Sequence, residues 1–152
     1  MTRTRIRRRT ETRKKMNAYT FTDIKEGMTA SFTTTVTEEW FDHFLAISGD
    51  DNPLHTDRAF AGDAGYEDRV LYGMCTAALY SRLAGVYLPG KYCLLQACEV
   101  SFVKPVFAGD SLTVTGTVKE VDERFRRIKV RADIRNGKGE KVSRATLFCG
   151  FT

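Results

Sequence analysis

The stretch from Ser48 to Asp57 concentrates the side chains of this chain that could do acid–base chemistry. Its Gly, Asp, Asn and Pro residues favour an irregular loop, and Pro53 disfavours helical geometry at the residue before it. Asp50 and His55, a carboxylate and an imidazole on one stiffened loop, could converge on a single water. Acid–base help from such a pair is worth about 10²–10⁴-fold in rate. Asn52 could orient one of these groups or the water.

A second candidate is Gly73, near the start of a helix that the apolar spacing predicts over Val70–Leu88. The helix is apolar over most of its circumference, which predicts burial, and Pro89-Gly90 should end it. A free backbone amide at a helix N-terminus is a ready donor to a developing oxyanion. Gly73 has no side chain to obstruct a bound molecule, and Tyr72 precedes it.

The same residues have plainer interpretations. Loops containing Asp-Asn-Pro are mostly turns, and Asp57 is a better helix cap than a catalytic acid. Asp51 and His43 are expected to be solvated. The loop residues alone therefore leave a structural turn and a catalytic loop both open.

The predicted elements form one α+β domain. The stretch after Thr37 has the cap and early carboxylates of a helix start, with Trp40, Phe41, Phe44, Leu45 and Ile47 on one face. Alternating or apolar runs predict strands, and Asn136-Gly137 predicts a hairpin. The predicted strands are Ala30–Thr37, Tyr92–Val103, Leu112–Val118, Ile128–Ile134 and Lys141–Phe151. An antiparallel sheet wrapped around one long central helix is the hot-dog architecture, which we expect over residues 16–152.

The charge of the chain is uneven. Its 152 residues carry a net charge of +5, but eight Lys and Arg against one Glu fall in residues 1–15. Residues 1–15 are therefore predicted to be a disordered basic tail, and the rest of the chain is mildly acidic. Met16 directly after this tail is a possible native start. We expect the tail to have no function. The alternative is an arm that binds nucleic acid or an acidic partner.

Composition excludes several classes of protein. No apolar run approaches the length of about 20 residues that a membrane helix needs, and no apolar segment follows the charged N-terminus, so a cytoplasmic protein is expected. The four cysteines form no C-x-x-C pair, which predicts free buried thiols. The two histidines do not cluster with them, so no metal centre is expected.

Three segments in order resemble the MaoC-like, (R)-specific enoyl-CoA hydratases. Phe44–Asp57 resembles the family's motif of Asp, four residues and His with Asn-Pro between. Leu71–Met74 resembles its His-Gly-Met at the start of the central helix, with Tyr72 in place of the usual His. Phe102–Asp110 resembles its Pro-Val and Gly-Asp turn, and the likeness spans Tyr19 to the C-terminus.

The resemblance implies a hot-dog homodimer that adds water to trans-2-enoyl thioesters, or removes it from (R)-3-hydroxyacyl thioesters. Asp50 and His55 would then hold the water, with Asp50 as the expected proton acceptor, and the Gly73 amide would bind the thioester oxygen. Asn52 and Tyr72 would lie beside the substrate. No cofactor is implied, because coenzyme A or an acyl carrier protein is part of the substrate. No nucleic-acid or membrane partner is expected.

Two rival functions stay open. A hot-dog acyl thioesterase usually carries a carboxylate base on or near the central helix, whereas Val70–Leu88 contains no Asp or Glu. The second rival function is that of a non-catalytic module, which would bind acyl-CoA or would bind nucleic acid through the tail. Residues 1–15 are too few for a helix-turn-helix and contain no aromatic residue for stacking on bases.

Overall fold

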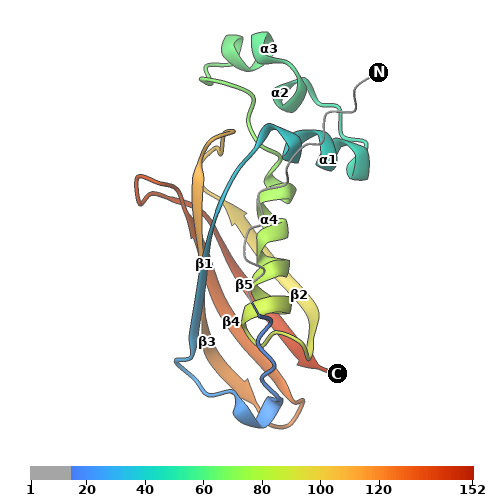
Figure 1. Cartoon of the computed structure of the whole chain (residues 1–152), viewed down its shortest axis with the longest axis vertical. Coiled ribbons are helices and arrows are strands. Elements are labelled where there is room, and N and C mark those ends of the chain that lie inside the picture. The colour runs from blue at the N-terminus through green and yellow to red at the C-terminus, as the bar shows by residue number, and fades with distance from the viewer. Residues whose placement is uncertain (1–14) are drawn as a thin grey trace, which may run out of the picture.

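The computed structural model describes residues 15–152, so the predicted basic tail lies outside the described residues except for Lys15. Five strands form one antiparallel sheet in the order β1-β3-β4-β5-β2, and α4 runs along one face of it (Figure 1). The strands are β1 (Thr29–Thr35), β2 (Cys93–Phe102), β3 (Ser111–Asp122), β4 (Arg127–Arg135) and β5 (Lys141–Phe151). The helices are α1 (Glu38–Ser48), α2 (Pro53–Thr56), α3 (Arg58–Asp63) and α4 (Gly73–Arg82), with a 3-10 turn at Phe21–Asp23 and a π-helical turn at Leu83–Tyr87.

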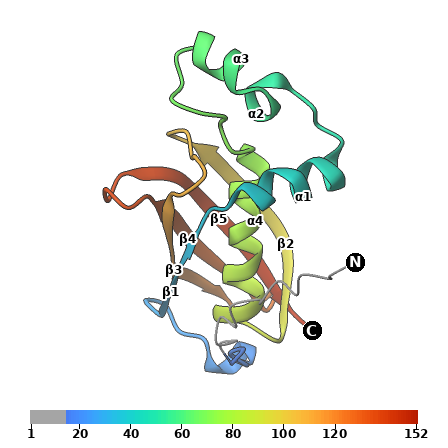
Figure 2. The ribbon, with the colours of Figure 1, turned by 45° about the horizontal axis from the view of Figure 1, so that its top comes forward.

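The core lies between α4 and the sheet, which curves around the helix (Figure 2). Alternate side chains of β3, β4 and β5 point into it, as period-2 patterning requires. Gly116 on β3 permits a close approach here, because a Cβ at this position would come within 2.7 Å of Leu83 Cδ2. The core residues of the sheet and of the helix are fully shielded, among them Leu112, Val114, Val130, Ile134, Leu147, Tyr80 and Leu83.

The central helix differs from its prediction at both ends. It begins at Gly73 rather than Val70, and its last turn, Leu83–Tyr87, is π-helical. Burial all round the helix is also wrong for the single chain, because Met74 is 64% exposed. Ile47 on α1 is likewise 83% exposed rather than part of the buried face. These apolar side chains lie on surfaces that a single chain leaves uncovered.

The hairpin between β4 and β5 is confirmed, but its loop is longer than a two-residue turn. Asn136 N donates to Glu140 O, and Gly139 N donates to Asn136 O. The left-handed residue is Gly139, with φ +77°, rather than Gly137. The five residues 136–140 therefore connect the strands, with hydrogen bonds between their own backbone groups, where the sequence favoured a two-residue turn.

Backbone hydrogen bonds of Asn17 anchor the start of the described chain. Asn17 N donates to Val86 O at 2.9 Å, and Lys91 N donates to Asn17 O at 2.8 Å. The four cysteines are free thiols, but of the expected buried thiols only Cys149 is fully buried, and Cys98 is exposed. None of the helices within residues 15–152 combines the length and apolarity needed to cross a bilayer.

Candidate functional site

The helices α1, α2 and α3 lie above the N-terminal end of α4 (Figures 1 and 2), and the predicted site residues belong to the segment from the end of α1 to the start of α4. A cavity of about 300 Å³ opens here, at the low end of the size range of small-molecule sites. Its wall combines an imidazole, a helix N-terminus and apolar side chains. The lining residues that matter for chemistry and shape are His55, Gly73, Thr76, Phe102, Val106 and Val142.

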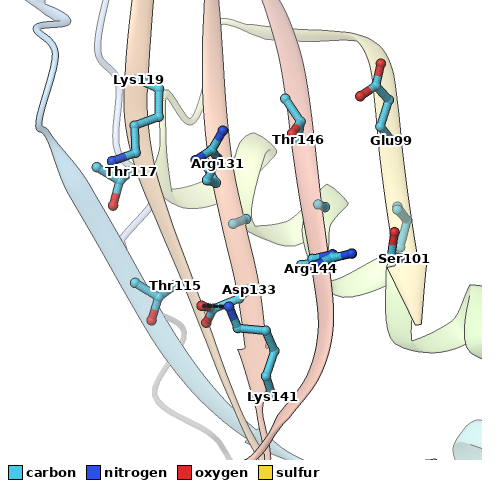
Figure 3. A pocket seen from close by; sticks show the side chains of 13 residues that line it. Glu99, Ser101, Thr115, Thr117, Lys119, Arg131, Asp133, Lys141, Arg144 and Thr146 are labelled. Carbon is cyan, nitrogen blue, oxygen red and sulfur yellow. Dashed lines mark ion pairs between the residues drawn. The ribbon is translucent and has the colours of Figure 1, made fainter. Parts of the chain in front are cut away.

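A larger hollow of about 630 Å³ lies on the opposite face of the sheet (Figure 3). It is lined by side chains that the strands direct away from the core, including Lys119, Arg131 and Arg144, and Lys141 pairs with Asp133 at 3.5 Å. None of the predicted site residues reaches it. Its polar, open surface is what the solvated face of an antiparallel sheet should present. The smaller cavity is therefore the candidate site.

The loop from Ser48 to Asp57 is ordered by side-chain caps. Asn52 Oδ1 accepts from Leu54 N at 2.9 Å, and Pro53 occupies the first turn of α2. This short helix was not predicted, although Asn52 does keep the extended conformation expected before proline. Asp57 caps α3 by accepting from Ala59 N at 2.8 Å, which confirms its structural role. The side-chain oxygen of Asn52 is thus occupied by the helix cap, and its side-chain nitrogen is the atom that could contact substrate.

His55 is held in one tautomer. Its Nδ1 lies 2.6 Å from Val70 O, and because a carbonyl only accepts, Nδ1 carries the proton. The remaining nitrogen, Nε2, is then the one that can accept from water or substrate in the neutral ring. Val70 is a site residue that sequence reasoning missed, because a backbone acceptor has no signature in residue type.

Asp50 is an exposed residue beside the cavity and does not line it. Its Oδ1 accepts from Asn52 N at 3.1 Å, and its backbone carbonyl accepts from Tyr72 Oη at 2.7 Å. His55 packs on the same tyrosine, with ring centroids 4.1 Å apart. Asp50, through its backbone carbonyl, and His55, through its ring, therefore both contact Tyr72, and His55 and Gly73 both line the cavity.

Gly73 is the first residue of α4, as an oxyanion donor should be. Within residues 15–152 its amide donates to no protein group, and α4 directs the positive end of its dipole there. A Cβ on this residue would lie 3.2 Å from the ring of Phe102. Glycine therefore keeps both the amide and the adjacent cavity wall open.

Arg69 joins α1 to the loop and was also missed. Its guanidinium lies 4.6 Å over the Phe41 ring, forms an ion pair with Glu38, and donates to His55 O at 3.4 Å. Its Nε is buried without a partner in the described part of the chain. A single arginine among many in this sequence carries no spacing signal that would have identified it.

Burial raises the pKa values of two groups near the cavity, so both stay protonated at neutral pH. It raises the pKa of Tyr72, and the nearby Asp50 carboxylate raises it further, so the phenol stays protonated and can donate. Burial also raises the pKa of Cys75, on α4, to about 11. This cysteine is therefore a neutral thiol rather than a nucleophile at neutral pH.

Known proteins share the sequence pattern and the fold of this chain. Residues 20–138 match the family described as MaoC like domain. The chain belongs to the MaoC-like domain family. Similar proteins include the (R)-specific enoyl-CoA hydratase of Aeromonas caviae, 42% identical over 80 residues, which are 53% of this chain and 60% of that protein. The enzyme of the same description from Rhodospirillum rubrum is 36% identical over 98 residues, covering 64% of this chain and 68% of its own length.

Solved structures confirm the fold of this MaoC-like domain. The (R)-hydratase from A. caviae involved in PHA biosynthesis superposes with a TM-score of 0.80 at 29% identity, covering 85% of this chain and 98% of that one. The R-hydratase of Pseudomonas aeruginosa gives the same TM-score at 28% identity, covering 86% and 84%. The prediction of an α+β hot-dog domain is confirmed by these likenesses and by the five-stranded sheet around α4.

Proposed function

We propose that this chain is a hydro-lyase that interconverts trans-2-enoyl and (R)-3-hydroxyacyl thioesters. Its relatives named as (R)-specific enoyl-CoA hydratases, and the 3-hydroxybutyryl-CoA dehydratase of Methylorubrum extorquens at 30% identity over 110 residues, support hydration and dehydration of acyl-CoA. The observation that carries the proposal is the pairing of His55 and the free Gly73 amide on one cavity wall. Hydration needs a group that handles a water proton and a donor for the enolate oxygen, and this wall supplies both.

In the proposed reaction, the water oxygen adds to C3 of the enoyl chain, the proton that the water loses is taken up by the Asp50 and His55 pair, and the pair returns one proton to C2. Asp50 and His55 hold the water, with Asp50 as the expected proton acceptor and His55 Nε2 as the nitrogen free to contact the water. Negative charge that develops on the thioester oxygen is stabilised by the amide of Gly73 at the N-terminus of α4. The thiol carrier, coenzyme A or an acyl carrier protein, belongs to the substrate, so the chain's own groups suffice.

The direct test follows the enoyl absorbance of crotonyl-CoA and longer trans-2-enoyl-CoAs, with chiral analysis of the product. We expect loss of absorbance and (R) configuration at C3. An (S) product would contradict the assignment. Release of free thiol and acid would instead establish the rival thioesterase activity, for which the central helix offers no carboxylate between Gly73 and Tyr87.

We also propose that the protein is a homodimer joined through β2. This strand is at the edge of the sheet, is bonded only to β5, and exposes Leu94 (50%) and Phe102 (50%). The other edge, β1, exposes Ser and Thr instead. An apolar edge strand is normally paired or covered, whereas a polar one is compatible with water.

The dimer test uses one substitution on each edge. Leu94→Glu on β2 is expected to shift the sedimentation coefficient to that of a monomer. Thr33→Glu on β1 is the matched control and should leave the dimer intact. A monomeric wild type, or dissociation by the β1 variant alone, would refute pairing through β2.

A further inference from the structure

Tyr72 combines deep burial with a hydroxyl aimed at the site loop. The residue is 2% exposed, and its Oη donates to the backbone carbonyl of Asp50 at 2.7 Å. This hydrogen bond joins the residue before α4 to a loop position 22 residues earlier. A buried hydroxyl requires such a partner, but the choice of the Asp50 carbonyl also fixes the backbone that carries the carboxylate.

The ring of Tyr72 acts on the second member of the pair. It packs on the His55 imidazole with centroids 4.1 Å apart and an interplanar angle of 30°. It also contacts Phe44 of α1, with centroids 4.7 Å apart. Contacts with both α1 and the loop hold the ring in place, so the imidazole packs against a fixed surface.

The neighbours of Tyr72 complete the arrangement. Val70 O fixes the tautomer of His55, and Gly73 offers the free amide. Three groups that must be in register for hydration are therefore set by four consecutive residues of one rigid segment. Displacement of a reacting group by about 1 Å can lower the rate by about 10²-fold. A segment that fixes the positions of these groups therefore maintains the rate.

We propose that Tyr72 is a positioning residue, whose hydroxyl holds Asp50 and whose ring holds His55 relative to the Gly73 amide. This inference rests on the proposed hydratase function. The competing explanation is that Tyr72 only fills the core, in which case its hydroxyl is irrelevant to rate. The two explanations differ in what the removal of one oxygen atom does.

The experiment compares Tyr72→Phe with Tyr80→Phe. Tyr80 lies on α4, is fully buried, and donates to Ser143 Oγ at 2.9 Å, so it loses an equivalent hydroxyl outside the cavity. For Tyr72→Phe we expect kcat for crotonyl-CoA hydration to fall by about 10-fold or more, with KM within about two-fold, because the loop is misplaced while the cavity stays open. For Tyr80→Phe we expect an unchanged kcat. Equal kcat losses in both variants, or an unchanged kcat in Tyr72→Phe, would overturn the proposal.

A second measurement does not depend on activity. The chain has only two histidines, so imidazole nitrogen resonances can be assigned to His55 and to the exposed His43. We expect Tyr72→Leu, which removes the ring and adds no third imidazole, to shift the ring nitrogen resonances of His55 while those of His43 stay in place. Unshifted His55 resonances in this variant would refute positioning of the ring. Wild-type protein that hydrates no enoyl thioester would refute the proposed function alone, because the His55 resonances still test the contact.

Discussion

The inner face of the sheet and the corner above α4 are held together in different ways. Leu112, Ile134 and Leu147 are completely shielded from solvent and packed among other apolar side chains. Asp50 and Asn52, by contrast, are exposed, and a few hydrogen bonds, such as those that their side-chain oxygens accept from backbone amides, position them. Burial stabilises the first region in proportion to area, whereas a few directional contacts define the second.

This difference separates stability from chemistry. Substitutions in the sheet should unfold the protein without altering the reaction that the folded fraction performs. Substitutions in the corner should slow the reaction without unfolding the protein, because the loop contributes little buried apolar surface. Each prediction below tests one side of this separation.

The largest effect is expected from the loop pair. Asp50→Asn and His55→Ala should each lower kcat by about 10²–10⁴-fold, the range for a positioned acid or base. If both side chains hold one water, the double variant should be about as slow as the slower single variant, because residues that act as a unit are not additive. Initial rates with crotonyl-CoA measure this.

Circular dichroism must show that each of these loop variants is folded. KM should change little, since the two groups contact water rather than the carrier. Fully multiplicative losses would indicate separate steps, and near-wild-type rates in the single variants would place the chemistry elsewhere.

The sheet should respond in the opposite way to Leu147→Ala on β5. This side chain is fully buried, so its truncation should lower the free energy of unfolding by about 2–5 kcal/mol, through lost transfer energy and the cavity left behind. Urea denaturation measures the loss. At a temperature where the variant is folded, kcat should stay near the wild-type value, and a 10²-fold drop there would show that the two regions are coupled.

Gly73→Ala changes a residue that lies where the site meets the buried core, at the first residue of α4. The added Cβ would lie 3.2 Å from the Phe102 ring, which is half exposed and can swing aside. We expect a change in unfolding free energy below about 1 kcal/mol, since alanine also favours the helix. The displaced ring should narrow the cavity, and kcat/KM for crotonyl-CoA should fall by about 10-fold, comparable to a methyl-sized change in an apolar pocket.

Phe102, the side chain that the added Cβ would approach, provides the control variant. Phe102→Ala in the Gly73→Ala background should restore part of kcat/KM, because it removes the ring that the Cβ displaces. No recovery would mean that the substitution disturbs the amide rather than the cavity wall.

The two regions also differ in how well the sequence predicted them. The strands and the central helix followed from periodicity, because the spacing of apolar side chains reports on burial, and the hairpin followed from Asn136-Gly137. The position of His55 beside Gly73 did not follow, since it depends on a backbone acceptor, Val70 O, that no residue type reveals. Arg69 was missed because the spacing of this chain's many arginines does not distinguish it, and α2 was missed because Pro53 begins a helix as readily as it ends one.

The exposed faces of α4 and β2 explain the remaining errors. Met74 was assigned to a buried helix face from its apolar neighbours, yet it is 64% exposed in the single chain. Apolar patterning predicts that a surface is covered and does not say which chain covers it. Pairing through β2, as proposed above, would account for both the pattern and the exposure.

The smallest effect is expected from removing residues 1–15. The first backbone hydrogen bonds of the described chain are made by Asn17, to Val86 and Lys91, and Met16 is itself 49% exposed. Of residues 1–15 only Met1 and Ile6 are large and apolar, so the segment has little to add to a core. A chain beginning at Met16 should therefore keep its melting temperature and its kcat within experimental error. A large loss of kcat would show that the basic segment takes part in closing the site, and salt-dependent DNA binding that disappears with the segment would restore the nucleic-acid alternative.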